Sequence, residues 1–175
     1  SNFKEYEDDE EENDIIKFAI IGRPNVGKSS LLNALLNEEK AIVSNVAGTT
    51  RDAVDTPFVY DKKDYVAIDT AGIRETDDIV ESIGVKKSLD LINEADLILY
   101  VLNNNEVLTS EEKIILEKIK NKNHIVIVNK IDLENKLDLN ELSNYIQMSV
   151  KDNVGIDELR NKIKEMFNLE QIEQN

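Results

Sequence analysis

The sequence has no cysteine and no tryptophan, and only one histidine, two prolines and six glycines among 175 residues. The lack of cysteine excludes disulfides and thiol chemistry, so we expect a cytoplasmic protein. No apolar run approaches the roughly 20 residues that span a bilayer. The first residues are acidic and do not resemble a signal peptide, so we expect neither secretion nor a membrane partner.

Charge of one sign dominates, because 36 acidic residues face 21 basic ones and give a net charge of −15. Residues 1–14 hold eight carboxylates and one lysine, which predicts an acidic disordered tail or an interaction arm. The rest is also acidic, which argues against direct binding of nucleic acid by this domain. The length fits one domain, predicted over residues 15–167, with a polar C-terminal tail over 168–175.

A phosphate-binding pattern, G-x-x-x-x-G-K-S/T, occupies Gly22–Ser29. An apolar strand leads in and a helix-forming run leads out, as this pattern requires. Backbone N–H groups point at the phosphates, Lys28 adds positive charge, and the hydroxyl of Ser29 is a ligand for Mg²⁺. The nucleotide-binding residues predicted here are Asn25, Val26, Gly27, Lys28, Ser29 and Ser30.

A base-recognition pattern, N-K-x-D, follows a second apolar run about a hundred residues later, at Asn129–Asp132. The carboxylate of Asp132 would accept hydrogen bonds from the ring N1–H and the exocyclic amine of guanine. Adenine has neither donor there, and a site built on such bonds rejects the analogue by about 10⁴-fold. The pattern therefore predicts GTP and GDP as ligands and conflicts with an ATP-dependent kinase.

Alternating apolar strands and amphipathic helices predict an α/β fold. We expect a six-stranded, mainly parallel sheet with helices on both faces and one antiparallel edge strand from an early hairpin. Strands are predicted over residues 16–21, 53–60, 65–68, 96–102, 124–128 and 145–148, and helices from the phosphate loop to 37 and over 83–93, 110–120, 139–144 and 156–167. Ser110 is the expected cap of the third helix. Ligands bind at the carboxyl ends of such strands, where the motifs converge.

Two further runs have the character of nucleotide-dependent switches. Asp69 begins D-T-A-G, in which the aspartate can hold Mg²⁺ through a water and the N–H of Gly72 can approach a γ-phosphate. Thr50 lies in G-T-T-R-D, where its hydroxyl can complete the Mg²⁺ shell. Contacts made only with the triphosphate would order these loops. The predicted Mg²⁺ ligands are Ser29, Thr50 and Asp69.

Together, G-R-P-N-V-G-K-S, G-T-T-R-D, D-T-A-G and N-K-I-D resemble the TrmE/Era/EngA group of GTPases over nearly all of residues 15–167. Residues 73–167 are most similar to the MnmE (TrmE) family of tRNA-modification GTPases. Residues 1–60 are more similar to the second G domain of the EngA (Der) ribosome-assembly family. A chimaera, an ancestor-like design and a divergent MnmE remain open. The resemblance implies a Ras-like P-loop GTPase that hydrolyses GTP.

The resemblance to MnmE also implies an unusual catalytic apparatus. Ile73 stands where many small GTPases place a glutamine that orients water, and an isoleucine cannot hydrogen-bond. No arginine is obviously posed as a finger, although Arg51 and Arg74 remain open. The family instead suggests a bound K⁺ ion, whose implied ligands are Asn25, Ser44, Val46 and Thr49. The implied catalytic residues are Glu81, which would orient the attacking water, with Asn25, Gly72 and Thr50.

The resemblance completes the base site and suggests a partner. Ser149-Val150-Lys151 stands where the family's S-A-K loop packs on guanine, so we expect the extra methyl groups of Val150 to weaken binding slightly. The residues assigned to the base are Asn129, Lys130, Asp132, Ser149, Val150 and Lys151. The family implies transient pairing of two G domains in the transition state. An EngA-like ribosome-assembly domain and a nucleotide-gated binding module with little hydrolysis are the alternatives.

Overall fold

The structure, a computed structural model, describes residues 15–36, 42–43, 55–60, 62–73 and 85–174. The strands are β1 (Ile16–Ile21), β2 (Ile42–Val43), β3 (Thr56–Tyr60), β4 (Lys63–Ala67), β5 (Leu97–Asn103), β6 (His124–Asn129) and β7 (Tyr145–Gln147). The helices are α2 (Lys28–Leu36), α4 (Val85–Glu94), α5 (Ser110–Ile119), the 3₁₀ helix η1 (Leu139–Glu141) and α6 (Ile156–Gln174). A further helical turn begins at Thr70. The acidic residues 1–14 lie outside the described residues.

The strands form one sheet in the order β2-β3-β4-β1-β5-β6-β7. Only β3 runs against the others, pairing antiparallel with both of its neighbours. All six predicted strands are present, and the mainly parallel α/β fold is confirmed. One detail differs: the reversed strand is not at the edge, because the two-residue strand β2 pairs beyond it as a seventh. Two residues are too few for a recognisable alternation in the sequence.

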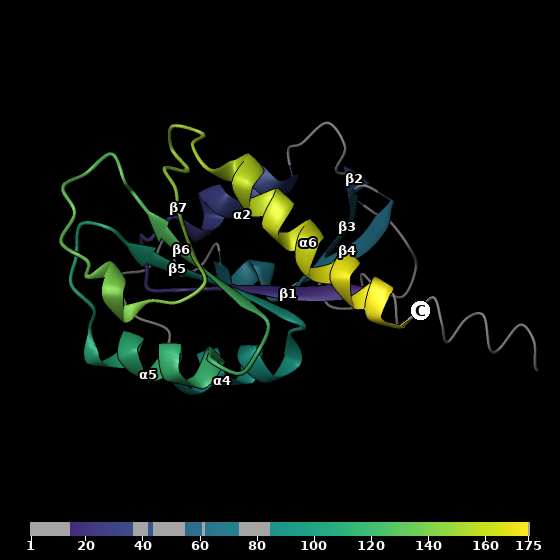
Figure 1. Ribbon diagram of the computed structural model, residues 1–175, viewed down its shortest axis with the longest axis horizontal. Helices are drawn as coiled ribbons and strands as arrows, with labels where there is room; N and C mark the ends of the chain where they lie inside the picture. The colour runs from purple at the N-terminus through teal and green to yellow at the C-terminus, as the bar shows by residue number, and fades with distance from the viewer. Residues whose placement is uncertain (1–14, 37–41, 44–54, 61, 74–84, 175) are drawn as a thin grey trace, which may run out of the picture.

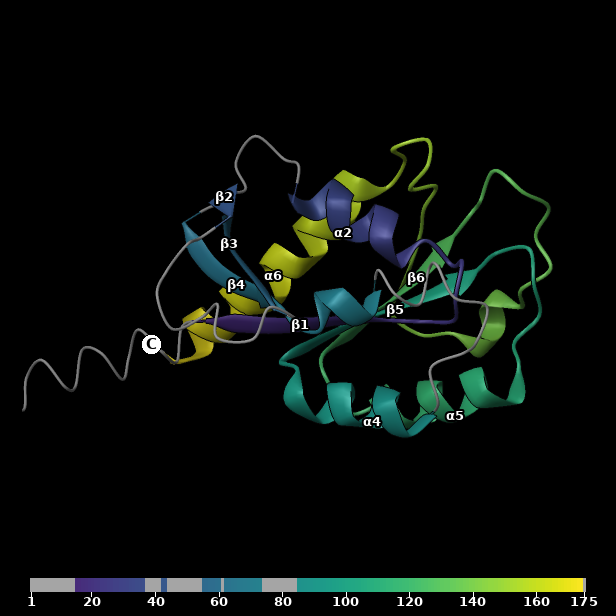
Figure 2. The same cartoon turned by 180° about the vertical axis from the view of Figure 1, so that it is seen from behind.

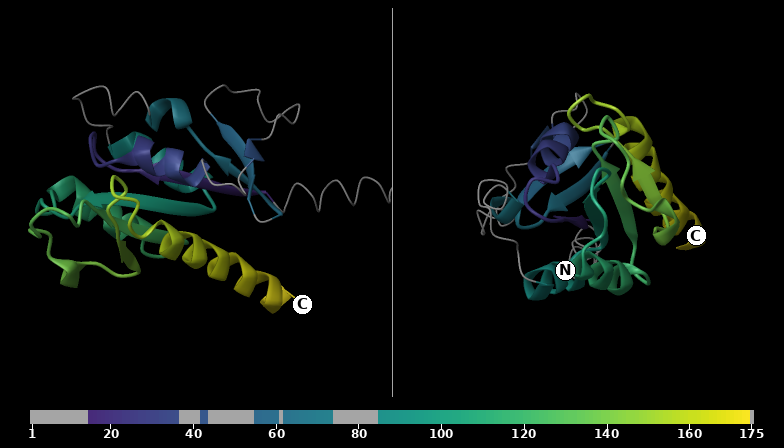
Figure 3. Two further views of the ribbon diagram at one scale, coloured as in Figure 1. Left: turned by 90° about the horizontal axis from the view of Figure 1, so that it is seen from above. Right: turned by 90° about the vertical axis from the view of Figure 1, so that its left-hand side faces the viewer.

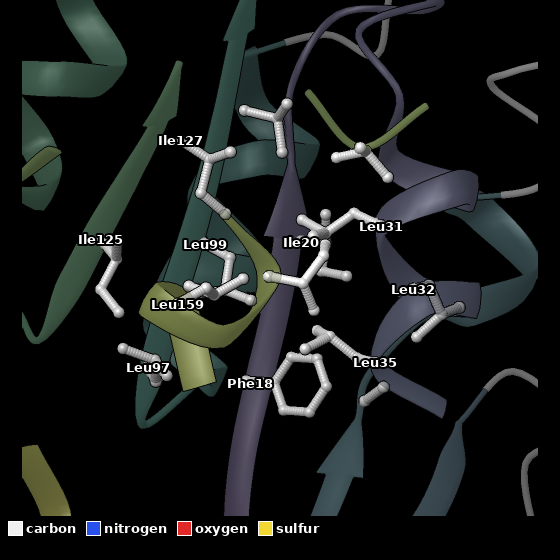
Figure 4. Packing of buried hydrophobic residues seen from close by; sticks show 14 of the residues in the cluster. Phe18, Ile20, Leu31, Leu32, Leu35, Leu97, Leu99, Ile125, Ile127 and Leu159 are labelled. Carbon is white, nitrogen blue, oxygen red and sulfur yellow. The ribbon is translucent and has the colours of Figure 1, made fainter. Parts of the chain in front are cut away.

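Helices cover the sheet on both faces, with α2 and α6 on one side and α4 and α5 on the other (Figures 1 and 2). The central strands are buried along their whole length, because both of their faces are covered. Toward α2 and α6, Leu99 and Ile127 pack with Leu31 and Leu159 (Figure 4). This packing fixes where the strands end, and the site is built at those ends.

Several element boundaries differ from the sequence prediction. The hairpin is tighter than expected, because Tyr60 pairs directly with Lys63. The predicted helix over 139–144 is a single 3₁₀ turn. The predicted polar tail after Phe167 is, through Gln174, part of α6. Among the described residues, no helix has both the length and the apolar character needed to cross a membrane.

The start of α5 corrects a predicted cap. Thr109, not Ser110, is the N-cap residue, with extended backbone angles. The hydroxyl of Thr109 accepts a hydrogen bond from the N–H of Glu112 at 3.1 Å, and the carboxylate of Glu112 accepts from the N–H of Thr109 at 2.9 Å. This reciprocal capping box stabilises the first turn. The sequence does distinguish the two hydroxyl residues, because Glu112 stands three residues after Thr109 whereas Lys113 stands three residues after Ser110.

We expect Thr109→Ala to lower the free energy of unfolding by about 1 kcal/mol, because the helix loses its capping oxygen. Ser110→Ala is the matched control and should change it by no more than a few tenths. Urea unfolding monitored by circular dichroism measures both. Equal effects of the two substitutions would contradict the assigned cap.

Candidate functional site

The phosphate loop links β1 to α2 and has the geometry of an anion cradle. Asn25 and Gly27 both have positive φ, at 66° and 104°, which turns successive backbone N–H groups toward one side. Lys28 is 1% exposed, and its ammonium donates to the carbonyls of Gly22 at 2.5 Å and Arg23 at 3.1 Å. The ammonium of Lys28 therefore lies on the concave side of the phosphate loop, where an anion would bind.

The base-recognition loop is bound directly to the phosphate loop. The side-chain amide of Asn129 donates to the carbonyl of Val26 at 2.8 Å, and its oxygen accepts from the N–H of Val150 at 3.0 Å. The ammonium of Lys130 donates to the carbonyl of Asn25 at 2.7 Å. Three predicted segments, distant in sequence, thus meet at one end of the sheet.

Asp132 lies beside the third of these segments. The hydroxyl of Ser149 donates to Asp132 at 3.3 Å and to Asp152 at 2.8 Å, and this hydroxyl can serve one acceptor at a time. Asp132 therefore keeps acceptor capacity for two donors of a base. Val150 is 8% exposed and belongs to the hydrophobic core, so its methyl groups pack mainly against protein.

Asn104 organises the base-recognition loop, a role that was not predicted from the sequence. Its N–H donates to the carbonyl of Asn129 at 2.8 Å, and its side-chain amide donates to the carbonyl of Leu133 at 3.1 Å. Its side-chain oxygen accepts from Asn135 at 2.6 Å. Asn104 is 3% exposed. The available signal was a run of three asparagines directly after a buried strand, where polar side chains need partners.

Asp69, the predicted metal ligand, follows β4 and has a positive φ of 55°. Its carboxylate accepts from the N–H of Gly72 at 3.3 Å and lies 3.4 Å from the ammonium of Lys87 on α4. A Cβ at Gly72 would lie 2.4 Å from this carboxylate, so any side chain there would force the carboxylate of Asp69 to shift. The carboxylate has the hard oxygen chemistry that suits Mg²⁺, as has the hydroxyl of Ser29. Lys87 is a charged neighbour that the sequence did not indicate.

A partly buried ion pair attaches the phosphate loop to α5. Arg23 donates to Glu112 at 3.2 Å and also to Glu106. Burial disfavours the charge of Arg23, but the two carboxylates outweigh it and raise the pKa of Arg23 above its ordinary value. Burial, reinforced by Glu112, also raises the pKa of the neighbouring Tyr100. Because Glu112 is part of the capping box of α5, the loop and the helix start share one hydrogen-bonded network.

The structure leaves part of the predicted site untested. Ser44, Val46, Thr49, Thr50 and Glu81 lie outside the described residues, as do Arg51 and Arg74. Ile73 is described and is 4% exposed within the core, so its side chain packs against protein. Asn25 is exposed at the surface of the phosphate loop, whereas Lys28 is buried. Ser30 and Lys151 are exposed near the same loops.

We expect Asn129→Ala to lower the free energy of unfolding without nucleotide by about 1–3 kcal/mol, because it leaves the carbonyl of Val26 and the N–H of Val150 unpaired. Asn140→Ala is the control, since Asn140 is exposed. Chemical denaturation measures both. Wild-type stability of Asn129→Ala would show that these bonds do not hold the loops together.

Comparison with known proteins places these loops in a family. A family model described as 50S ribosome-binding GTPase matches residues 17–130. The tRNA modification GTPase MnmE of Streptococcus agalactiae is 52% identical over 150 residues, which cover 85% of this chain and 33% of the relative. MnmE of Staphylococcus epidermidis is 52% identical over 154 residues, covering 85% and 34%. The chain spans about a third of the length of these curated relatives.

Solved structures agree with this placement. Era in complex with MgGDPNP and a segment of 16S ribosomal RNA superimposes with a TM-score of 0.55 and 27% identity, over 86% of this chain and 56% of Era. The G domain of the T. maritima FeoB iron transporter superimposes with a TM-score of 0.56 and 27% sequence identity, over 86% of this chain and 98% of the FeoB domain. The predicted resemblance to MnmE is confirmed. A phosphate loop bound to a guanine-type recognition loop, and a family match over most of the chain, show that this chain belongs to the 50S ribosome-binding GTPase family of P-loop GTPases.

Proposed function

We propose that the chain is the GTP-hydrolysing G domain of an MnmE-like tRNA-modification GTPase that requires Mg²⁺ and is stimulated by K⁺. The main support for this proposal is the hydrogen bond of Asn129 to the phosphate loop. It holds the two loops together, so that the base-recognition loop can bind the base while the phosphate loop binds the phosphates of the same nucleotide. Relatives named MnmE share about half of the residues across the domain. The part in tRNA modification would belong to the longer protein.

The residues of the phosphate loop and of D-T-A-G bind different parts of the triphosphate and its metal ion. Lys28 moves from carbonyls of its own loop to the β- and γ-phosphates, which offer it charged acceptors. Ser29 and Thr50, and Asp69 through a water, would hold a Mg²⁺ ion, which would neutralise phosphate charge. The carboxylate of Asp69 would then have the metal as a charged partner in place of Lys87. The N–H of Gly72, which donates to Asp69 in this structure, would turn to the γ-phosphate.

The water and the developing charge need other groups, because Ile73 is packed in the core. Glu81 orients the attacking water through a second water. Asn25, exposed on the phosphate loop, supplies a side-chain oxygen for K⁺, together with Ser44, Val46 and Thr49. A cation there would place positive charge near the oxygen that bridges the β- and γ-phosphates. In other GTPases an arginine stabilises the transition state in this way. Two G domains pair while these loops are closed.

We expect turnover of GTP to rise at least about tenfold when K⁺ replaces Na⁺ at equal ionic strength, because a fixed charge at the transition state is worth several kcal/mol. Steady-state phosphate release measures the rate in each salt. Asn25→Ala should remove most of the difference. Equal rates in the two salts would contradict the K⁺ site and leave guanine-nucleotide binding unaffected.

We expect Glu81→Ala to slow hydrolysis severalfold or more while the affinity for GTP changes little, because the residue acts on the water and not on the nucleotide. Glu94→Ala, at the exposed end of α4, is the matched control. Single-turnover hydrolysis and equilibrium binding of a fluorescent GTP analogue separate the two effects. An unchanged rate for Glu81→Ala would favour the EngA-like alternative, and negligible single-turnover hydrolysis by the unmodified chain would favour the binding module.

A further inference from the structure

An aromatic groove lies between α6 and the β3–β4 hairpin, and the proposed function does not use it. It has a volume of about 50 Å³. Three rings form its floor: Phe58 stacks on Tyr65 with ring centroids 5.3 Å apart, and Phe18 meets Phe58 edge-on at 5.6 Å. Tyr60 is half-buried at its side. The groove is therefore a preformed apolar surface that a further aromatic side chain could extend.

Positive charge surrounds this groove. Lys63, Arg160 and Lys164 line it, and among the described residues that line it none is acidic. Arg160 also pairs with Asp157, at 2.8 Å. These cations have interactions within the chain, so any attraction comes from the summed charge of the cluster and not from a vacant partner. The cluster contrasts with the net charge of the whole chain, which is −15.

The groove lies at the end of the sheet away from the phosphate loop. Helix α6 runs from the site end toward the opposite end of the molecule (Figures 1 and 3). Ile16 begins β1 there, and its side chain packs, like that of Ile163, against the core cluster that includes Phe18. Phe18 and Ile163 also line the groove. The residues before β1 therefore leave the domain beside it.

Those preceding residues have the complementary chemistry. Residues 1–14 carry eight carboxylates against one lysine, and they include Phe3 and Tyr6. Tyr6 is nine residues from Ile15, a span of up to about 30 Å in an extended chain. The segment can thus bring an aromatic ring and several carboxylates to the groove without crossing the molecule.

We propose that residues 1–14 dock on the aromatic groove of their own domain, with the ring of Tyr6 in the groove and the carboxylates facing Lys63, Arg160 and Lys164. Phe58 and Tyr65 are only 5% and 6% exposed, so the ring covers the narrow apolar lining that the groove leaves accessible, and the contact brings opposite charges together. Attachment to the same chain gives the segment a high effective concentration, so weak contacts suffice. Salt weakens the docking, because the charges lie at the surface.

The absence of tryptophan provides the test, because Tyr6→Trp places a single fluorescent indole in the full chain. At low salt, where the segment is docked, we expect the indole to emit at shorter wavelength than at high salt and to be quenched severalfold less by acrylamide. The additional substitutions Lys63→Glu and Lys164→Glu should remove this protection from quenching at low salt. The control is Lys118→Glu, exposed on α5 across the sheet, which should keep it. Thermal unfolding and binding of GDP check that each variant is folded.

Three outcomes would overturn the proposal. An indole that is fully quenched at every salt concentration shows no docking. Protection that grows with protein concentration identifies a second copy as the occupant. Protection that appears only with anionic lipid vesicles identifies a membrane surface. If the double substitution prevents folding, the salt dependence of Tyr6→Trp and the single substitution Lys63→Glu decide the question. None of these readouts depends on hydrolysis of GTP, so failure here leaves the proposed function standing.

Discussion

The site depends on one buried amide, the side chain of Asn129. It bonds to the phosphate loop with its nitrogen and to the loop after β7 with its oxygen, and it is 4% exposed. Both partners are backbone groups that have lost contact with water, so the bonds are expensive to leave unmade. Lys130 adds a second attachment to the phosphate loop. The nucleotide pocket is therefore shaped before any ligand arrives.

A second support reaches the phosphate loop from the other side of the sheet. Arg23 is bound by Glu112, whose other oxygen caps α5, so the same carboxylate closes a helix and anchors a loop. Breaking such a pair leaves a buried charge uncompensated, whereas the pair itself contributes modestly. The ion pair mainly fixes the position of Arg23. The carbonyl of Arg23 accepts a hydrogen bond from Lys28, and that contact positions the ammonium group that would bind the phosphates.

Much of the fold and the site followed from the sequence, because each motif sits at the end of a strongly apolar strand. β1 was predicted to the residue, and the convergence of Asn129 and Lys130 with the phosphate loop followed from parallel strands ending at one edge. The rest depends on tertiary partners. Nothing in the local sequence distinguishes Asn104 from its two asparagine neighbours, or shows that Lys87 faces Asp69. Thr109, by contrast, was predictable, because it alone of the two adjacent hydroxyl residues has a glutamate three residues later, at Glu112.

The space between Gly27 and Asn129 links two positions about a hundred residues apart. A single methyl group at Gly27 would lie 2.5 Å from the amide nitrogen of Asn129, at a backbone φ of 104°. A side chain there would push away the very group that ties guanine recognition to the phosphate loop. A substitution at Gly27 would therefore disturb the base-recognition loop together with the phosphate loop, and a second substitution at Asn129 would leave the backbone strain at position 27 in place.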